Sequence, residues 1–142
     1  RTQLSVKLNS IFTFRSRVEM VWFDKRGSAA ENGFTIFTDL LYNPMMKPLS
    51  GNIRLQYFET DGYNSRVYSY ENDVLYGYSI PVFYDKGYRY YINVNYDINK
   101  RISLWAKWAQ TIYSDKTLIG SGLDEIEGNH KTEVKLQLRY KF

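Results

Sequence analysis

Few residues of this chain have the types and spacing that catalysis needs. Its one histidine, His130, lies close in sequence to Ser121, Asp124 and Asn129, and a serine hydrolase needs a histidine base beside a serine nucleophile and an orienting Asn or Asp. No nucleophile motif surrounds these residues, and no acid–base pair stands at a recognisable spacing. We therefore expect a solvated loop histidine and no enzymatic activity, with His130 as a catalytic base kept as an alternative.

A short acidic cluster is the strongest candidate for a metal site. Asp124, Glu125 and Glu127 could hold Ca²⁺, but calcium sites need six to eight oxygens in a shaped loop, and this cluster lacks the spacing of such a loop. Ser121, three residues before Asp124, fits a short capped helical turn. The chain also has no cysteine, which excludes thiolate zinc sites and disulfides. We expect a turn here, and neither a metal nor a cofactor.

Basic residues recur on the polar side of alternating segments. The seven are Lys7, Arg17, Arg54, Arg89, Lys107, Lys135 and Arg139, set against Glu19, Asp39 and Glu133. In a barrel this face lines the lumen, where an excess of positive charge favours anionic solutes or an acidic plug. Paired charges that simply fill a closed interior are the alternative. The pI of 9.2 is weak evidence for nucleic-acid binding, because the basic residues are spread along a wall rather than clustered.

Tyrosines crowd the segment 61–86, which we expect to be an external loop. They are Tyr63, Tyr68, Tyr70, Tyr76, Tyr78 and Tyr84. Tyrosine buries a large area at low entropic cost, so these rings could stack on sugars or on a partner protein. We favour the alternative that they pack with one another and fix the loop.

The elements that must position these side chains are strands with one polar and one apolar face. Residues 131–142 alternate between the two classes over twelve positions, which indicates a long strand. The same period predicts strands at 3–10, 16–23, 33–43, 50–60, 87–97 and 101–113. Most approach the roughly 9–11 residues that a tilted strand needs to cross a bilayer. No apolar run is long enough for a transmembrane helix.

The connections between these strands alternate in length. Short ones are predicted near 12–16, at 43–48 and at 97–100, and long polar ones at 24–32, 61–86 and 114–130. Short turns on one side and long loops on the other are typical of outer-membrane barrels. We interpret 61–86 as a hairpin that projects above the membrane, because Pro81 counts against a regular spanning strand.

The pattern predicts an all-β fold, an antiparallel transmembrane β-barrel. Bacterial barrels have even strand numbers and must close, so seven strands indicate the C-terminal part of a larger barrel, or partner strands in another chain. Residues 1–142 form a single domain without repeat or linker. No signal region follows Arg1, so we interpret the chain as a mature protein or a piece of a longer one.

Several strings of residues carry a family resemblance. They are 70–76 (YENDVLY), 79–81 (SIP), 110–113 (QTIY), 120–126 (GSGLDEI), 128–129 (GN) and the strand 135–142. Together they resemble the C-terminal barrel region of Bacteroidota outer-membrane proteins that carry helix-hairpin-helix repeats near their N-terminus, over roughly the whole chain. The final strand also resembles the signal read by the outer-membrane insertion machinery, through Lys135, Tyr140 and Phe142, with Gln137 where that signal usually has Gly.

The leading hypothesis is an outer-membrane β-barrel component with a transport, structural or assembly role and a mildly basic lumen side. Expected partners are the lipid bilayer, lipopolysaccharide, the insertion machinery and other outer-membrane chains. One alternative is a soluble β-barrel or sandwich that binds a ligand, lipocalin-like or lectin-like, with the apolar face as its core. The resemblance implies another, a DNA-uptake-related protein, although the helix-hairpin-helix repeats are absent here and nucleic acid is not an expected partner of this segment.

Overall fold

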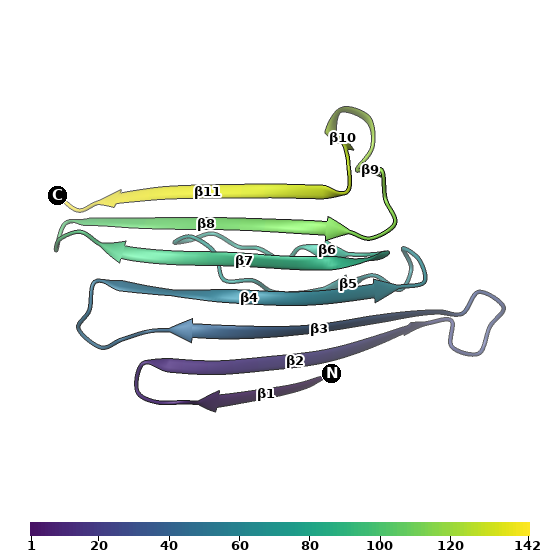
Figure 1. Cartoon of the computed structure of the whole chain (residues 1–142), viewed down its shortest axis with the longest axis horizontal. Coiled ribbons are helices and arrows are strands. Elements are labelled where there is room, and N and C mark those ends of the chain that lie inside the picture. The colour runs from purple at the N-terminus through teal and green to yellow at the C-terminus, as the bar shows by residue number, and fades with distance from the viewer.

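The computed structural model describes all residues, 1–142, and is all-β apart from one short 3-10 turn. Seven long strands form one antiparallel sheet in the order β1-β2-β3-β4-β7-β8-β11 (Figure 1). Their bounds are β1 (Thr2–Lys7), β2 (Phe12–Phe23), β3 (Glu31–Tyr42), β4 (Leu49–Thr60), β7 (Lys86–Asp97), β8 (Ile102–Tyr113) and β11 (His130–Tyr140). The seven predicted strands are therefore confirmed as strands of one sheet. The chain contains no helix long and apolar enough to cross a membrane.

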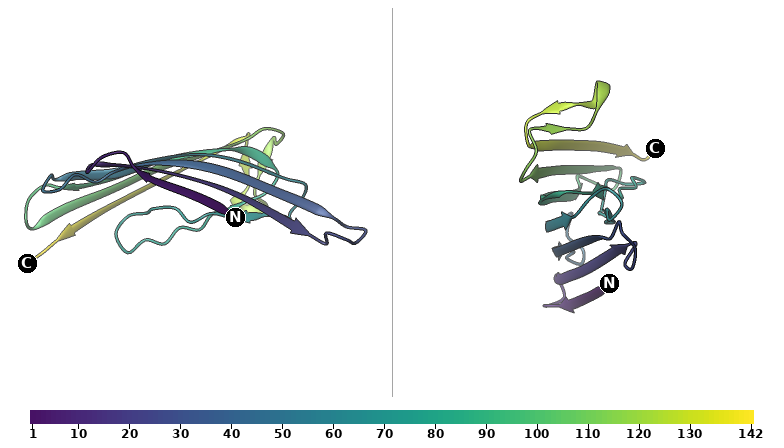
Figure 2. Two further views of the ribbon diagram at one scale, coloured as in Figure 1. Left: turned by 90° about the horizontal axis from the view of Figure 1, so that it is seen from below. Right: turned by 90° about the vertical axis from the view of Figure 1, so that its right-hand side faces the viewer.

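The sheet is open. β1 pairs only with β2, and β11 pairs only with β8, so each leaves one row of backbone groups without a strand partner. Figure 2 shows the sheet twisted and curved, with β1 and β11 at its two edges. The all-β, antiparallel part of the predicted fold is confirmed, whereas closure into a barrel is not seen within this chain.

Short turns gather at one end of the sheet and long connections at the other (Figure 1). The first turn spans residues 8–11, where the side-chain oxygen of Asn9 accepts the backbone N–H groups of Ile11 and Phe12 at 2.8 Å. Asn99 closes the β7–β8 turn in the same way, because an Asn side chain can imitate a backbone turn. The predicted connection at 12–16 is wrong, since those residues already belong to β2.

Two small hairpins lie within the long connections. β5 (Val67–Tyr68) pairs with β6 (Val82–Phe83), and β9 (Leu118–Ile119) pairs with β10 (Ile126–Glu127). The 3-10 turn η1 (Gly122–Asp124) separates β9 from β10. Ser121 occupies the N-cap of η1, as the sequence predicts, but its side chain makes no capping hydrogen bond.

Residues 61–85, here called the strap, fold back against the polar face of the sheet (Figure 2). The prediction that this segment projects beyond the strands is wrong. Val67 and Phe83 of the strap are buried with residues of the sheet in one apolar cluster of Phe58, Val67, Phe83, Tyr113 and Ile119. At Gly33, a Cβ would lie only 2.1 Å from the Ser65 carbonyl oxygen, so this close approach requires glycine.

The two faces of the sheet show an inverted burial pattern. The strap covers the polar face, where Arg54 and Lys107 are buried. The opposite face carries large apolar side chains in the open, with Leu55 64% and Leu136 73% exposed. Charged residues are rarely buried in water-soluble proteins, and an apolar patch across a whole sheet marks an interaction surface.

Strand position in the sheet predicts unequal protection of the backbone amides. We expect amide hydrogen exchange to be slowest in β7 and fastest in the outward-pointing amides of β1, because β7 is paired on both sides and β1 on one. Exchange measured by mass spectrometry on the purified chain in detergent checks this. Equal protection of β1 and β7 would mean that the outer edge of β1 is paired.

Candidate functional site

The pairing register of the strands places the predicted basic and acidic residues on one face of the sheet. Lys135 lies opposite Lys107 in the β11–β8 ladder, and Lys107 lies opposite Asn93. Arg54 lies opposite Asp39, which in turn lies opposite Arg15. The strap rests on this face, so the candidate site is the interface between the strap and the polar side of β3, β4, β7, β8 and β11.

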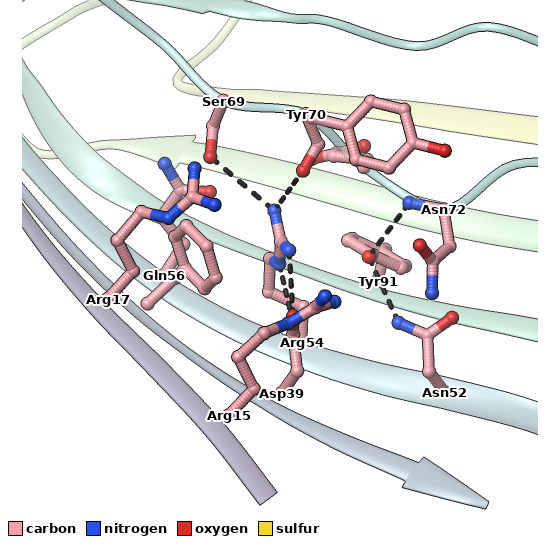
Figure 3. A network of polar contacts seen from close by, with 12 residues as sticks. Arg15, Arg17, Asp39, Asn52, Arg54, Gln56, Ser69, Tyr70, Asn72 and Tyr91 are labelled. Carbon is pink, nitrogen blue, oxygen red and sulfur yellow. Dashed lines mark hydrogen bonds and ion pairs between the residues drawn. The ribbon is translucent and has the colours of Figure 1, made fainter. Parts of the chain in front are cut away.

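The first anchor of the strap is an arginine–aspartate pair. Arg54 donates two hydrogen bonds to Asp39, at 2.6 and 2.8 Å, in a paired geometry. Its remaining nitrogen donates to the carbonyl oxygen of Tyr70 in the strap at 2.6 Å, as Figure 3 shows. Arg15 donates to the same carboxylate at 2.7 Å. Asp39 therefore pairs with two arginines, and Arg54 also holds the strap backbone.

The second anchor is a buried carboxylate from the strap. The Glu71 side chain has no exposed surface. It accepts two hydrogen bonds from Arg89, at 2.6 and 2.9 Å, and one from Lys107 at 2.9 Å. Arg89 also donates to Glu133 of β11 at 2.7 Å. Charge-assisted, paired hydrogen bonds of this kind are the strong ones, so Glu71 fixes the strap to β7 and β8, and Arg89 extends the network to β11.

The third anchor joins the strap to the edge strand β11. Lys135 donates a hydrogen bond to the carboxylate of Asp73, whose side chain is buried. Burial disfavours the charged carboxylate and is the largest single influence on it. The hydrogen bonds from Lys135 and the Val74 backbone N–H, together with the charges of Lys107 and Lys135, outweigh burial and hold the pKa of Asp73 below its ordinary value. Asp73 is therefore ionised at neutral pH.

Tyr91 links the charged anchors at the centre of the sheet. Its ring faces two cations, with the Arg54 guanidinium carbon 5.4 Å and the Lys107 nitrogen 4.8 Å from the ring centre. Its hydroxyl oxygen accepts hydrogen bonds from the Asn52 side chain and the Asn72 backbone N–H, at 3.0 and 3.2 Å (Figure 3). Strap and sheet thus share one continuous polar network.

The structure brings together only part of the predicted basic set. Arg54, Arg89, Lys107 and Lys135 meet carboxylates beneath or beside the strap. Arg17 instead donates to Gln3 at 2.9 Å, and Arg139 lies 5.1 Å from the centre of the Trp105 ring with its Nε unpartnered. Lys7 stands exposed in β1. The predicted basic residues without a carboxylate partner therefore lie on the outer strands β1, β2 and β11.

Four of the six predicted loop tyrosines pair with another ring of the strap, although most of the six remain exposed. Tyr63 packs against Tyr84 at 5.4 Å between ring centres, and Tyr70 against Tyr78 at 6.1 Å. Arg66 donates a hydrogen bond to the Tyr68 hydroxyl at 2.8 Å. Tyr76 is 89% exposed and has no ring partner. At the end of β11, Tyr140 packs against Phe142 with ring centres 5.1 Å apart.

The remaining sequence candidates lie away from the strap. His130 begins β11 and lies opposite Ile112 in the ladder, and no hydrogen bond joins it to Ser121, Asp124 or Asn129. The acidic cluster falls on η1 and the strand after it, where its side chains are exposed.

Sequence reasoning missed Glu71 and Asp73, which are the strap's own contribution to the site. One signal could have identified them. They stand two positions apart, so in extended chain both side chains point the same way, and the basic excess on the polar strand face requires acidic partners. Arg15 was also missed, although it continues the period of Arg17.

Comparison with protein-family models, with curated proteins and with solved structures finds no match to this chain. The site is therefore interpreted from its own geometry. That geometry is an ion-paired contact between the strap and the polar face of the sheet.

Replacing Glu71 tests the central anchor. Glu71→Gln leaves Lys107 and Arg89 buried without the charge that pairs them, and breaking a buried pair costs about 3–5 kcal/mol. We expect the free energy of unfolding in urea to fall by that amount in detergent. Trypsin should also cleave faster after Arg66, which lies in the strap.

The matched control is Glu125→Gln, at an exposed acidic residue where about 0.5 kcal/mol or less is expected. An unfolding midpoint and a cleavage rate that both match the wild type for Glu71→Gln would contradict the anchoring role.

The lowered pKa of Asp73 predicts the direction in which the free energy of unfolding changes with pH. Because its pKa is lowered on folding, its ionised form stabilises the folded chain above the ordinary value of 3.8, and this contribution is lost as the pH falls through the lowered value. The difference in unfolding free energy between wild type and Asp73→Asn should stay constant near neutral pH and shrink in acid. A difference that grows on acidification would contradict the ion pair with Lys135.

Proposed function

We propose that the chain forms part of the wall of an outer-membrane β-barrel, with the strap on the lumen side. The observation that carries this proposal is the inverted burial of the sheet. Its charged face is covered by protein and its apolar face is open. Membrane barrels have this arrangement, because lipid replaces water outside and polar groups fill the interior.

The distribution of side chains along the apolar face supports the proposal. Toward the loop end, the rings of Phe34, Tyr57 and Tyr88 lie in a row across β3, β4 and β7, with centres 6.4 and 5.2 Å apart. Toward the turn end, Phe12 packs against Tyr42 at 5.2 Å. Aliphatic side chains such as Leu55 lie between these two rows, interrupted by the Tyr90–Trp108 ring pair. Aromatic belts on both sides of an aliphatic band are typical of barrels at the two membrane interfaces.

Strand length and connection length agree with this orientation. β2, β3, β4, β7 and β8 each have 12 residues, enough for a tilted crossing. The short turns all lie at one end (Figure 1), which corresponds to the periplasmic side, and the long loops correspond to the external side.

The open edges specify what must lie beside this sheet. Hydrocarbon offers no hydrogen bonds, so the outer edges of β1 and β11 require further strands. We propose that strands outside this sheet, in a longer chain or in another outer-membrane chain, complete the wall. Lys135, Tyr140 and Phe142, which resemble the insertion signal, suit a contact with the insertion machinery.

The strap favours a plugged or narrowed interior over an open anion pore. Glu71 and Asp73 of the strap, together with Glu133 of β11, neutralise Arg89, Lys107 and Lys135. The mildly basic lumen expected from the strands is therefore largely neutralised where the strap sits. Barrels are often closed by internal loops. A structural or assembly role, or transport that depends on movement of the strap, fits this charge pattern.

A charge on the apolar face tests the membrane assignment. Leu55→Arg places a cation midway along β4, which costs about 2–4 kcal/mol at the centre of a bilayer. We expect the chain to partition from urea into phosphatidylcholine vesicles and the variant to partition less by that free energy. The control is Leu123→Arg, in the exposed turn η1, which should partition like the wild type.

The rival is a soluble sandwich in which the apolar face is a core. This alternative predicts that the wild-type chain is monomeric and soluble in detergent-free buffer and does not bind the vesicles. That result would overturn the membrane proposal.

A further inference from the structure

A cavity of about 440 Å³ lies between the tip of the strap and the turn end of the sheet. Residues 70–77 of the strap form one wall, and the polar face of β3, β4, β7 and β8 forms the other. Pockets for small ligands span roughly 300–1,000 Å³, so the size suits a small ligand. The cavity borders the first and third anchors through Tyr70 and Asp73, and its lining does not depend on what covers the apolar face.

Side-chain amides dominate the polar lining. Five asparagines contribute to it, namely Asn43, Asn52, Asn72, Asn93 and Asn95. The amide oxygens of Asn93 and Asn95 have no hydrogen-bond partner in the protein. Asn72 binds Tyr91 through its backbone N–H, which leaves its side chain unused in that contact. Each amide offers both donors and acceptors, as a hydroxyl group requires.

The lining is nearly free of charge. Asp73 is the only ionisable acid or base around the cavity, and Lys135 already pairs with it. The one charged group in the lining is therefore already held in an ion pair. The chemistry of the lining favours a neutral ligand.

Aromatic rings complete the lining, and one of them is held in a strained conformation. Tyr70, Tyr76 and Trp105 border the cavity. Tyr76 has a φ of 60°, a left-handed conformation that a bulky residue adopts only at a cost of about 1–3 kcal/mol. The turn is closed by a hydrogen bond from the Gly77 N–H to the Val74 carbonyl oxygen at 2.8 Å. It keeps the exposed Tyr76 ring at the rim.

We propose that this cavity binds a neutral polyhydroxylated ligand, a sugar unit of an uncharged glycan. The hydroxyl groups donate to and accept from the asparagine amides, and the C–H face of the sugar packs on the Tyr76 ring. The inference goes beyond the barrel proposal, since it requires only the strap seated on the sheet.

The test uses the full chain in a detergent without a sugar headgroup. Maltotriose, mannotriose and N-acetylated chitotriose are the neutral probes, and trigalacturonate is the charged comparison. We expect at least one neutral trisaccharide to change the intrinsic tryptophan fluorescence in a saturable way, with little dependence on salt.

Two variants locate the site. Asn72→Ala removes an amide, and Tyr76→Gly removes the ring while relieving the left-handed strain. Each should weaken binding about tenfold or more, which is about 1.4 kcal/mol. The unfolding midpoint of Tyr76→Gly should stay the same or rise, which separates ligand binding from folding. Asn129→Ala, at an exposed asparagine outside the cavity, is the control and should bind like the wild type.

Three results would overturn the proposal. The first is no fluorescence response to any neutral trisaccharide, and the second is trigalacturonate binding that is tighter than that of the neutral probes and depends on salt. The third is wild-type affinity in both Asn72→Ala and Tyr76→Gly. Vesicle partitioning measures the affinity of the chain for lipid, whereas the fluorescence titration measures its affinity for a glycan. A chain that fails to partition can therefore still bind a glycan, and a chain that partitions can fail to bind one.

Discussion

The structure depends on one buried carboxylate. Glu71 brings a negative charge from a connecting segment to a place where two cations, Arg89 and Lys107, would otherwise share only the charge of Glu133. Removing ions from water is costly, and paired geometry with full hydrogen bonding is what offsets the cost. With Glu71 in place the strap lies against the sheet, and Val67 and Phe83 reach the apolar cluster around Phe58. Charge pairing and apolar burial thus hold the same segment.

The seated strap explains how one sheet keeps two opposite environments. Without it, the polar face would present Arg54, Arg89 and Lys107 along an open wall. With it, the charges are paired and the strands are covered on that side only. The apolar face gains no such cover from any segment of the chain. The difference in burial comes from the position of a single connection, whereas the difference in polarity comes from the side-chain alternation within the strands.

Local periodicity explains which parts of the fold were predictable. Alternation of side chains is a property of each strand alone, so strand positions and the two faces followed from residues such as Leu136 and Lys135. The strap did not, because its contacts join residues distant in sequence. Glu71 is 18 positions from Arg89 and 36 from Lys107, and Asp73 is 62 from Lys135. No period links such partners. The first turn was misplaced for a smaller reason, since Asn9 closes it earlier than the apolar pattern suggested.

The base of the strap is narrow. The backbone N–H of Thr60 donates to the carbonyl oxygen of Asp85, and the N–H of Asp85 donates to the Thr60 hydroxyl, both at 2.8 Å. β4 and β7 therefore meet as an ordinary hairpin whose ladder is complete before the strap begins. The entropy of closing a connection grows only slowly with its length, by about 0.6 kcal/mol per doubling. The segment thus behaves as an insertion carried by a hairpin, and a change in its length costs little closure entropy while the strand register stays fixed.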